Sequence, residues 1–210
     1  LSLTREARLQ DLTPLLSCLL KSLAGTEVAI ESLAQLDSDD LIERGANCVC
    51  MYRWLYLPSR VRRYQDRRHN EGWYKLAAIV AAGTLAEDSF SRIHGHPQFA
   101  TLADLSGPDP VAQNLLLVGE WYRVLARIRH HWPGVRRLLD LGLRTDLGDR
   151  PPRSAADRLF AELATETHSP LAARLAALVR PCPNVFAAAK QITPAVCAEF
   201  AAALPGLADA

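Results

Sequence analysis

Long apolar runs and a strong net charge are both absent from this sequence. No stretch approaches the roughly 18 to 20 apolar residues that a membrane-spanning helix needs, and the opening LSLTREARLQ lacks the basic, apolar and small segments of a signal peptide. The formal net charge is only +1, so nucleic acid or anionic lipid would have to be attracted by a local patch of charge. The sequence therefore predicts an intracellular protein, cytoplasmic or nuclear, without a membrane span.

Cysteine is also scarce. The chain has five cysteines among 210 residues, an odd number that leaves no complete disulfide framework and is typical of a reducing compartment. Cys48 and Cys50 stand two residues apart, and on a helix their side chains would point about 200° apart. We therefore expect them not to chelate one metal together and interpret them as small buried thiols.

The familiar catalytic motifs are missing as well. The chain contains no Gly-rich phosphate loop, nucleophile elbow or HExxH. His94 and His96 lie close to Glu87 and Asp88, but no third metal ligand follows at a fixed spacing. The sequence thus identifies no catalytic residue, metal ligand or cofactor, and we lean toward a protein that is not an enzyme. A helical enzyme or small-ligand pocket protein stays open, because helical pockets often need only scattered residues.

Strand signals are nearly absent, whereas helix signals run from end to end. No alternating apolar stretch is bounded by hairpin turns, and Ala and Leu dominate. Ser59, Ser154, Ser169 and Thr193 each stand where a capping hydroxyl would start a helix. We predict an all-α fold, a multi-helix bundle or orthogonal helical array of about nine to ten helices. Allowing short neighbours to merge, these helices cover residues 4–24, 26–36, 38–57, 59–69, 73–83, 85–94, 98–105, 110–131, 134–142, 154–167, 170–180, 184–191 and 194–203.

We expect one domain over residues 1–210. The segment RTDLGDRPPR, residues 144–153, gathers turn residues and charge and is the candidate for a subdomain boundary. Because the sequence begins without Met, we also expect it to be a fragment of a larger protein.

The segment 110–131 has the clearest amphipathic pattern. Apolar side chains that include Trp121 and Tyr122 cover about half of the helix circumference, while Glu120 and Arg123 lie on the other side. We predict a central packing helix with Trp121 buried in the core.

The most distinctive stretch is RGANCVCMYRWLYLPSRVRRYQDRRH, residues 44–69. We interpret residues 41–57 as a buried helix and residues 59–69 as a basic helix on which Arg60, Arg63 and Arg67 form one stripe within about 60°. Arg68 and His69 extend this stripe, and guanidinium groups bind oxyanions bidentately. The stripe is therefore the predicted site for an acidic or phosphate-bearing partner. A solvated face packed on the acidic segment 27–43 is the structural alternative.

Part of this stretch also resembles a DNA-binding motif. GANCVCMYRWL, residues 45–55, is similar to the recognition-helix half of helix-turn-helix proteins, in which a Gly turn precedes the helix that enters the major groove. The resemblance implies that Asn47 and Arg53 contact bases. Against it, Cys48, Val49 and Cys50 occupy positions where such a helix needs polar side chains.

These patterns predict a helical protein-interaction or scaffold module that binds another protein with an acidic surface through Arg60, Arg63, Arg67, Arg68 and His69. The alternative is a nucleic-acid-binding regulator that places the same arginines on phosphates. The sequence does not indicate the oligomeric state.

Overall fold

The computed structural model describes most of the chain, which divides by its internal contacts into two compact units. The described residues are 5–36, 48–51, 53–87, 89, 102–148, 152–167 and 169–208. The first unit comprises residues 1–86 and 134–145, and the second comprises residues 87–133 and 146–210. One passage between the units lies within the predicted boundary segment 144–153, while the single-domain organisation stays a prediction.

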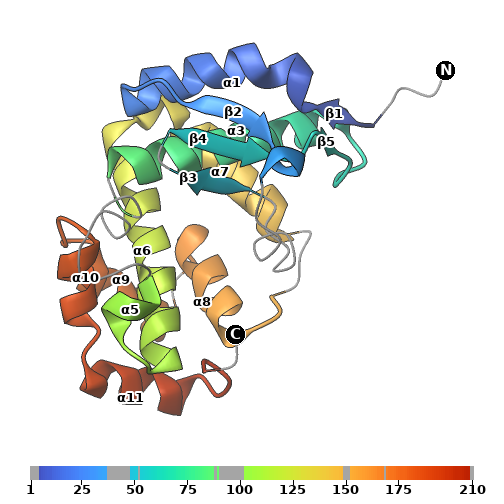
Figure 1. Ribbon diagram of the computed structural model, residues 1–210. Helices are drawn as coiled ribbons and strands as arrows, with labels where there is room; N and C mark the ends of the chain where they lie inside the picture. Colours follow the sequence, from blue (N-terminus) through green and yellow to red (C-terminus); the bar gives the residue numbers. More distant parts are fainter. Residues whose placement is uncertain are drawn as a thin grey trace. The chain divides into compact units, whose positions relative to one another are not determined.

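The described residues are mostly helical, with nine α-helices and two small sheets among them (Figure 1). A largely helical fold is thus confirmed. The expectation of an all-α fold is wrong in the first unit, because that unit contains both sheets.

The first unit contains three helical segments. They are α1 (Leu9–Ala24), α3 (Arg67–Ala86) and residues 134–145 of α7 (Pro133–Gly148). Helix α1 packs along α3 (Figure 1), and Leu16 and Leu20 are fully buried. Gly142 allows α7 to approach α3, since a Cβ at this position would lie 3.2 Å from the Leu76 side chain.

A three-stranded sheet accompanies these helices in the order β2-β4-β3. Strand β2 (Ala29–Ser32) is parallel to β4 (Trp54–Leu57), and β3 (Val49–Met51) is antiparallel to β4. A second, two-stranded ribbon pairs β1 (Ala7–Arg8) with β5 (Arg60–Val61). A short 3₁₀ turn, η1 (Leu33–Gln35), follows β2.

The predicted helices over residues 26–36, 38–57 and 59–69 are therefore wrong over most of their described parts, although Leu33–Gln35 form a 3₁₀ turn and Arg67–His69 begin α3. The sequence WLYL of β4 is apolar at every position, so it fits a buried helix as well as a strand. In the structure Leu55 and Leu57 are buried while Trp54 and Tyr56 are not, which is the two-residue period of a strand. Ser59 starts no helix, and its carbonyl accepts a hydrogen bond from the Leu9 backbone N–H.

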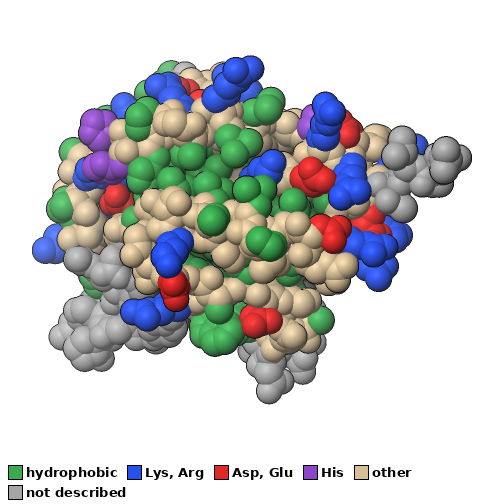
Figure 2. Space-filling model, turned by 90° about the horizontal axis from the view of Figure 1, so that it is seen from above, with side chains coloured by type: hydrophobic (Ala, Val, Ile, Leu, Met, Phe, Trp, Pro, Cys, Tyr) green, Lys and Arg blue, Asp and Glu red, His purple; other side chains and the backbone are tan. Residues whose placement is uncertain are grey.

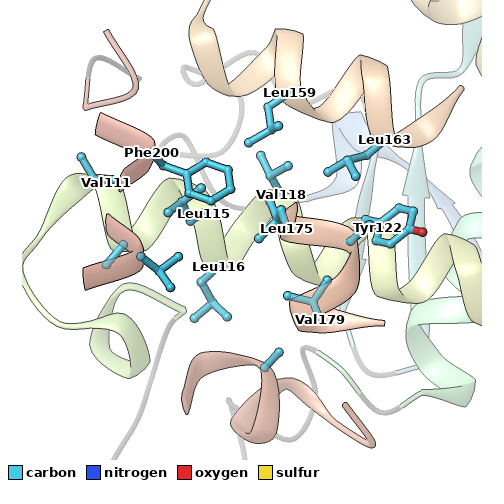
Figure 3. Close-up of a cluster of buried hydrophobic side chains, with 14 of the residues drawn as sticks. Val111, Leu115, Leu116, Val118, Tyr122, Leu159, Leu163, Leu175, Val179 and Phe200 are labelled. Carbon is cyan, nitrogen blue, oxygen red and sulfur yellow. The ribbon is translucent and has the colours of Figure 1, made fainter. Parts of the chain in front are cut away.

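The second unit is built around α6 (Pro110–His131), whose bounds agree with the prediction. Around it pack α5, α8, α9, α10 and α11 (Leu102–Ser106, Ala155–Ala164, Pro170–Val179, Val185–Gln191 and Pro194–Ala203). Figure 3 shows Leu115 and Val118 of α6 among Leu159 of α8, Leu175 of α9 and Phe200 of α11, which form one buried cluster. The Ser154, Ser169 and Thr193 side chains cap their helices as expected.

Helix α6 departs from its predicted faces at three residues. Trp121 is only half-buried, so its prediction as a core residue is wrong. Glu120 and Arg123, expected opposite the apolar face, are fully buried. The Arg123 guanidinium donates to both Glu120 carboxylate oxygens, at 2.8 and 2.9 Å, and to the Glu87 carboxylate at 2.9 Å. In the sequence, a pair at i, i+3 looks like a solvated surface pair. Only the tertiary contacts of Arg123 with Glu87 and Ser89 distinguish it.

Candidate functional site

The predicted arginine stripe lies on the β1–β5 ribbon and at the start of α3, rather than on one helix. Arg60 belongs to β5, Arg63 follows it, and Arg67 and Arg68 open α3. We call Arg60, Arg63, Arg67, Arg68 and His69 together the arginine surface. Arg60, Arg67, Arg68 and His69 are exposed, and Arg63 is half-buried.

A buried carboxylate, Glu6, holds three arginines at the ribbon. Its side chain is 5% exposed and accepts hydrogen bonds from Arg62 Nε at 2.6 Å and Arg8 Nε at 2.8 Å, while Arg60 Nε lies 3.7 Å away. The strand register explains the arrangement, because Arg8 and Arg60 are opposite each other and Glu6 directly precedes β1. The hydrogen bond from Arg62 is the main reason that the pKa of Glu6 lies below its ordinary value.

Tyr64 lies beside two further residues of the arginine surface, Arg63 and His69. This buried ring lies 5.7 Å from the Arg63 guanidinium and 6.0 Å from the His69 ring, which approaches it edge-on. Arg63 and His69 therefore both lie against the Tyr64 ring, although Arg63 follows β5 and His69 lies in α3.

Asn70 fixes the backbone beneath these side chains. Its side-chain oxygen accepts from the Tyr64 backbone N–H at 2.9 Å, and its amide nitrogen donates to the carbonyls of Arg5 and Tyr64 at 2.7 and 2.9 Å. The side chain is fully buried. Asn70 thus ties the chain before β1, the turn after β5 and α3 together, and sequence reasoning missed both it and Glu6. Neither has a sequence signal, since each also contacts a partner about 60 residues away, Arg62 for Glu6 and Arg5 for Asn70.

Carboxylates are interleaved with the cations of this region. Arg67 donates to Glu71 at 2.9 Å and lies 4.0 Å from Asp11, and Asp66 caps α3 by accepting from the Arg68 backbone N–H at 2.9 Å. On the right of Figure 2, where the β1–β5 ribbon lies, Lys or Arg and Asp or Glu side chains are intermixed. The surface is therefore positive in excess but not of one sign.

The helix-turn-helix interpretation is wrong over the described part of residues 45–55. Residues 49–51 and 54–57 are strands, and Arg53 lies in the turn that leads into β4. Asn47, the second predicted base contact, lies outside the described residues.

The cysteine pair and the two histidines are the residues whose side chains could bind a metal. Cys50 lies in β3 and Cys48 directly precedes this strand, so the described structure does not place the two on a helix as the sequence predicted. Burial raises the pKa of Cys48 to about 12 and that of Cys50 to about 11, so both stay protonated thiols near neutral pH. Residues 91–100, with His94 and His96, lie outside the described part, and within the described part no cluster of three metal-ligating side chains occurs.

Comparisons of the chain with known protein families, curated proteins and solved structures find no match. Among the helices that the structure describes, none is both long and apolar enough to cross a membrane.

Proposed function

We propose that this protein is an interaction or scaffold module whose arginine surface binds an acidic segment of another protein. The observation that carries the proposal is the buried Glu6 carboxylate, which holds Arg60 of the arginine surface and the neighbouring Arg8 and Arg62 at the ribbon. One carboxylate against three guanidinium groups leaves an excess of positive charge. Because the groups are already positioned, less side-chain entropy is lost when a partner binds.

The interleaved carboxylates favour an acidic protein over nucleic acid. Asp11, Asp66 and Glu71 lie among the arginines, and a continuous row of phosphates would meet repulsion at each of them. An acidic peptide can place single carboxylates on single guanidinium groups, which bind carboxylates in a bidentate manner.

A binding comparison tests the proposal. The fluorescence anisotropy of a labelled oligoglutamate peptide and of a labelled short DNA duplex is measured with the full chain over a range of salt concentrations. We expect the peptide to bind more tightly than the duplex, with affinity that falls as salt rises because exposed charges are screened.

Tighter binding of the duplex, with a steep dependence on salt, would instead support the nucleic-acid alternative. Absence of peptide binding at low salt would overturn the proposal.

A further inference from the structure

An open groove of about 620 Å³ lies in the first unit between α1 and the entrances of β2 and β4. These two strands are parallel, so their first residues, Ala29 and Trp54, are neighbours in the sheet. One face of α1, with Pro14, Cys18 and Lys21, forms the opposite wall. The volume lies within the range of about 300 to 1,000 Å³ that is usual for small-molecule sites.

Trp54 gives the groove an aromatic wall. Among the large apolar side chains that are exposed in the described residues, it is the only aromatic one, with 45% of its surface accessible. Its ring lies nearly parallel to that of Tyr56, at a centroid distance of 6.2 Å and an angle of 17°. The backbone of Arg53 is fixed by a hydrogen bond of 2.7 Å from the Ala29 N–H to its carbonyl. The indole is therefore supported in place while remaining accessible.

The groove also carries two cations and one carboxylate. Lys21 Nζ donates to Glu27 Oε1 at 2.7 Å, and the Glu27 pair raises the pKa of Lys21, so the ammonium stays charged. An ammonium group has three N–H donors, so two remain for another acceptor. Arg53 adds a guanidinium group to the lining. The charges therefore favour an anion, and Glu27 offers an acceptor to an N–H group of the same ligand.

From this juxtaposition we infer that the groove is a binding site for a planar aromatic molecule that carries an anionic group and is about the size of a mononucleotide. The aromatic ring stacks on Trp54, and the anionic group binds Lys21 and Arg53. The site shares no residue with the arginine surface, so it does not depend on the function proposed for that surface.

Nuclear magnetic resonance of the tryptophan side chains tests this inference. The chain has four tryptophans, and the Trp54→Phe variant assigns the indole N–H signal of Trp54. Titration with adenosine monophosphate should shift that signal saturably at millimolar ligand or below. Adenosine and inorganic phosphate, which each carry half of the recognised chemistry, should each bind at least about tenfold more weakly.

Variants of the groove provide the second arm. Trp54→Ala and Lys21→Met should each weaken binding of adenosine monophosphate by at least about tenfold, monitored by backbone amide signals that also report folding. Trp132→Phe, in the second unit, should bind as the wild type does.

Cys18 offers an independent readout, because it is the only exposed cysteine of the five. Bound adenosine monophosphate should slow its reaction with a thiol reagent. The inference is overturned if the Trp54 signal does not shift saturably, if adenosine binds as well as its phosphate, or if Trp54→Ala binds unchanged while folded.

Discussion

Asn70 is the residue at which three parts of the first unit meet, through hydrogen bonds to the backbone of Arg5 and Tyr64. Replacement by Ala leaves these backbone groups without their partner in a buried place. We expect Asn70→Ala to lower the free energy of unfolding by about 2 to 4 kcal/mol, measured by denaturant titration. Gln10→Ala, at an exposed position of α1, is the control and should cost less than about 0.5 kcal/mol. A loss for Asn70→Ala no larger than that of the control would contradict the assigned role.

Glu6 makes stability depend on pH. Its pKa is lower in the folded protein than its ordinary value, chiefly because Arg62 donates a hydrogen bond to it. The stabilisation is therefore complete above the ordinary pKa of about 4.3, and it is lost as pH falls through the lower folded-state pKa.

We expect the difference in unfolding free energy between wild type and Glu6→Gln to be largest near neutral pH and to shrink below about pH 4. Denaturant titrations at a series of pH values measure it. A difference that stays constant across the acid range would show that Glu6 does not hold the arginines as a carboxylate.

Strand β4 contributes Leu55 to the core and Trp54 to the candidate ligand site. Leu55 is fully buried, whereas 45% of the Trp54 surface is exposed. We expect Leu55→Ala to cost about 2 to 5 kcal/mol, and Trp54→Ala to cost less than about 1 kcal/mol, in the same thermal or denaturant assay. Equal large losses would mean that β4 is covered on both faces, as the helical interpretation of this stretch implied.

The end of α8 holds the only residue other than glycine with a positive φ among the described residues, Glu166 at 57°. The Thr167 N–H donates to the Glu162 carbonyl and the Glu166 N–H to the Leu163 carbonyl, which is the turn that glycine usually completes after a helix. Glu166→Gly should therefore be more stable than Glu166→Ala by about 1 kcal/mol. Both variants lack the carboxylate near Arg129, so their comparison isolates the backbone effect. Equal stabilities would contradict it.

How much of each element the sequence predicts depends on where its stabilising contacts lie. Helices α6 and α11 have the predicted bounds, because Asp109 and Thr193 cap them and Pro follows each cap, all within a few residues. The strands were not predicted, because β2 and β4 are stabilised by pairing with each other. The paired residues are 25 positions apart in the sequence. Their apolar and aromatic residues carry no local preference strong enough to exclude a helix.

For the whole molecule, the division into two units could not be predicted from the sequence. Residues 134–145 belong with the first unit although the whole of α6 precedes them in the second. Turn residues stand at both ends of this segment, Pro133-Gly134 and those of 144–153, but they do not indicate to which unit the segment returns. The sequence shows that residues 60–69 are basic. It does not show that Glu6 and Asn70 position these residues. Charge composition is local, but the pairing of β1 with β5 spans more than 50 residues.

The most direct test of the proposed function is a matched pair of charge reversals. Arg68→Glu acts on the arginine surface, and Arg137→Glu makes the same change at an exposed position of α7 in the same unit. An acidic residue in the first turn of α3 is compatible with the helix dipole, so Arg68→Glu should fold normally. We expect the affinity for the oligoglutamate peptide to fall at least about fivefold in Arg68→Glu, and to remain near the wild-type value in Arg137→Glu. Equal affinities of the two variants would contradict the assignment of binding to the arginine surface.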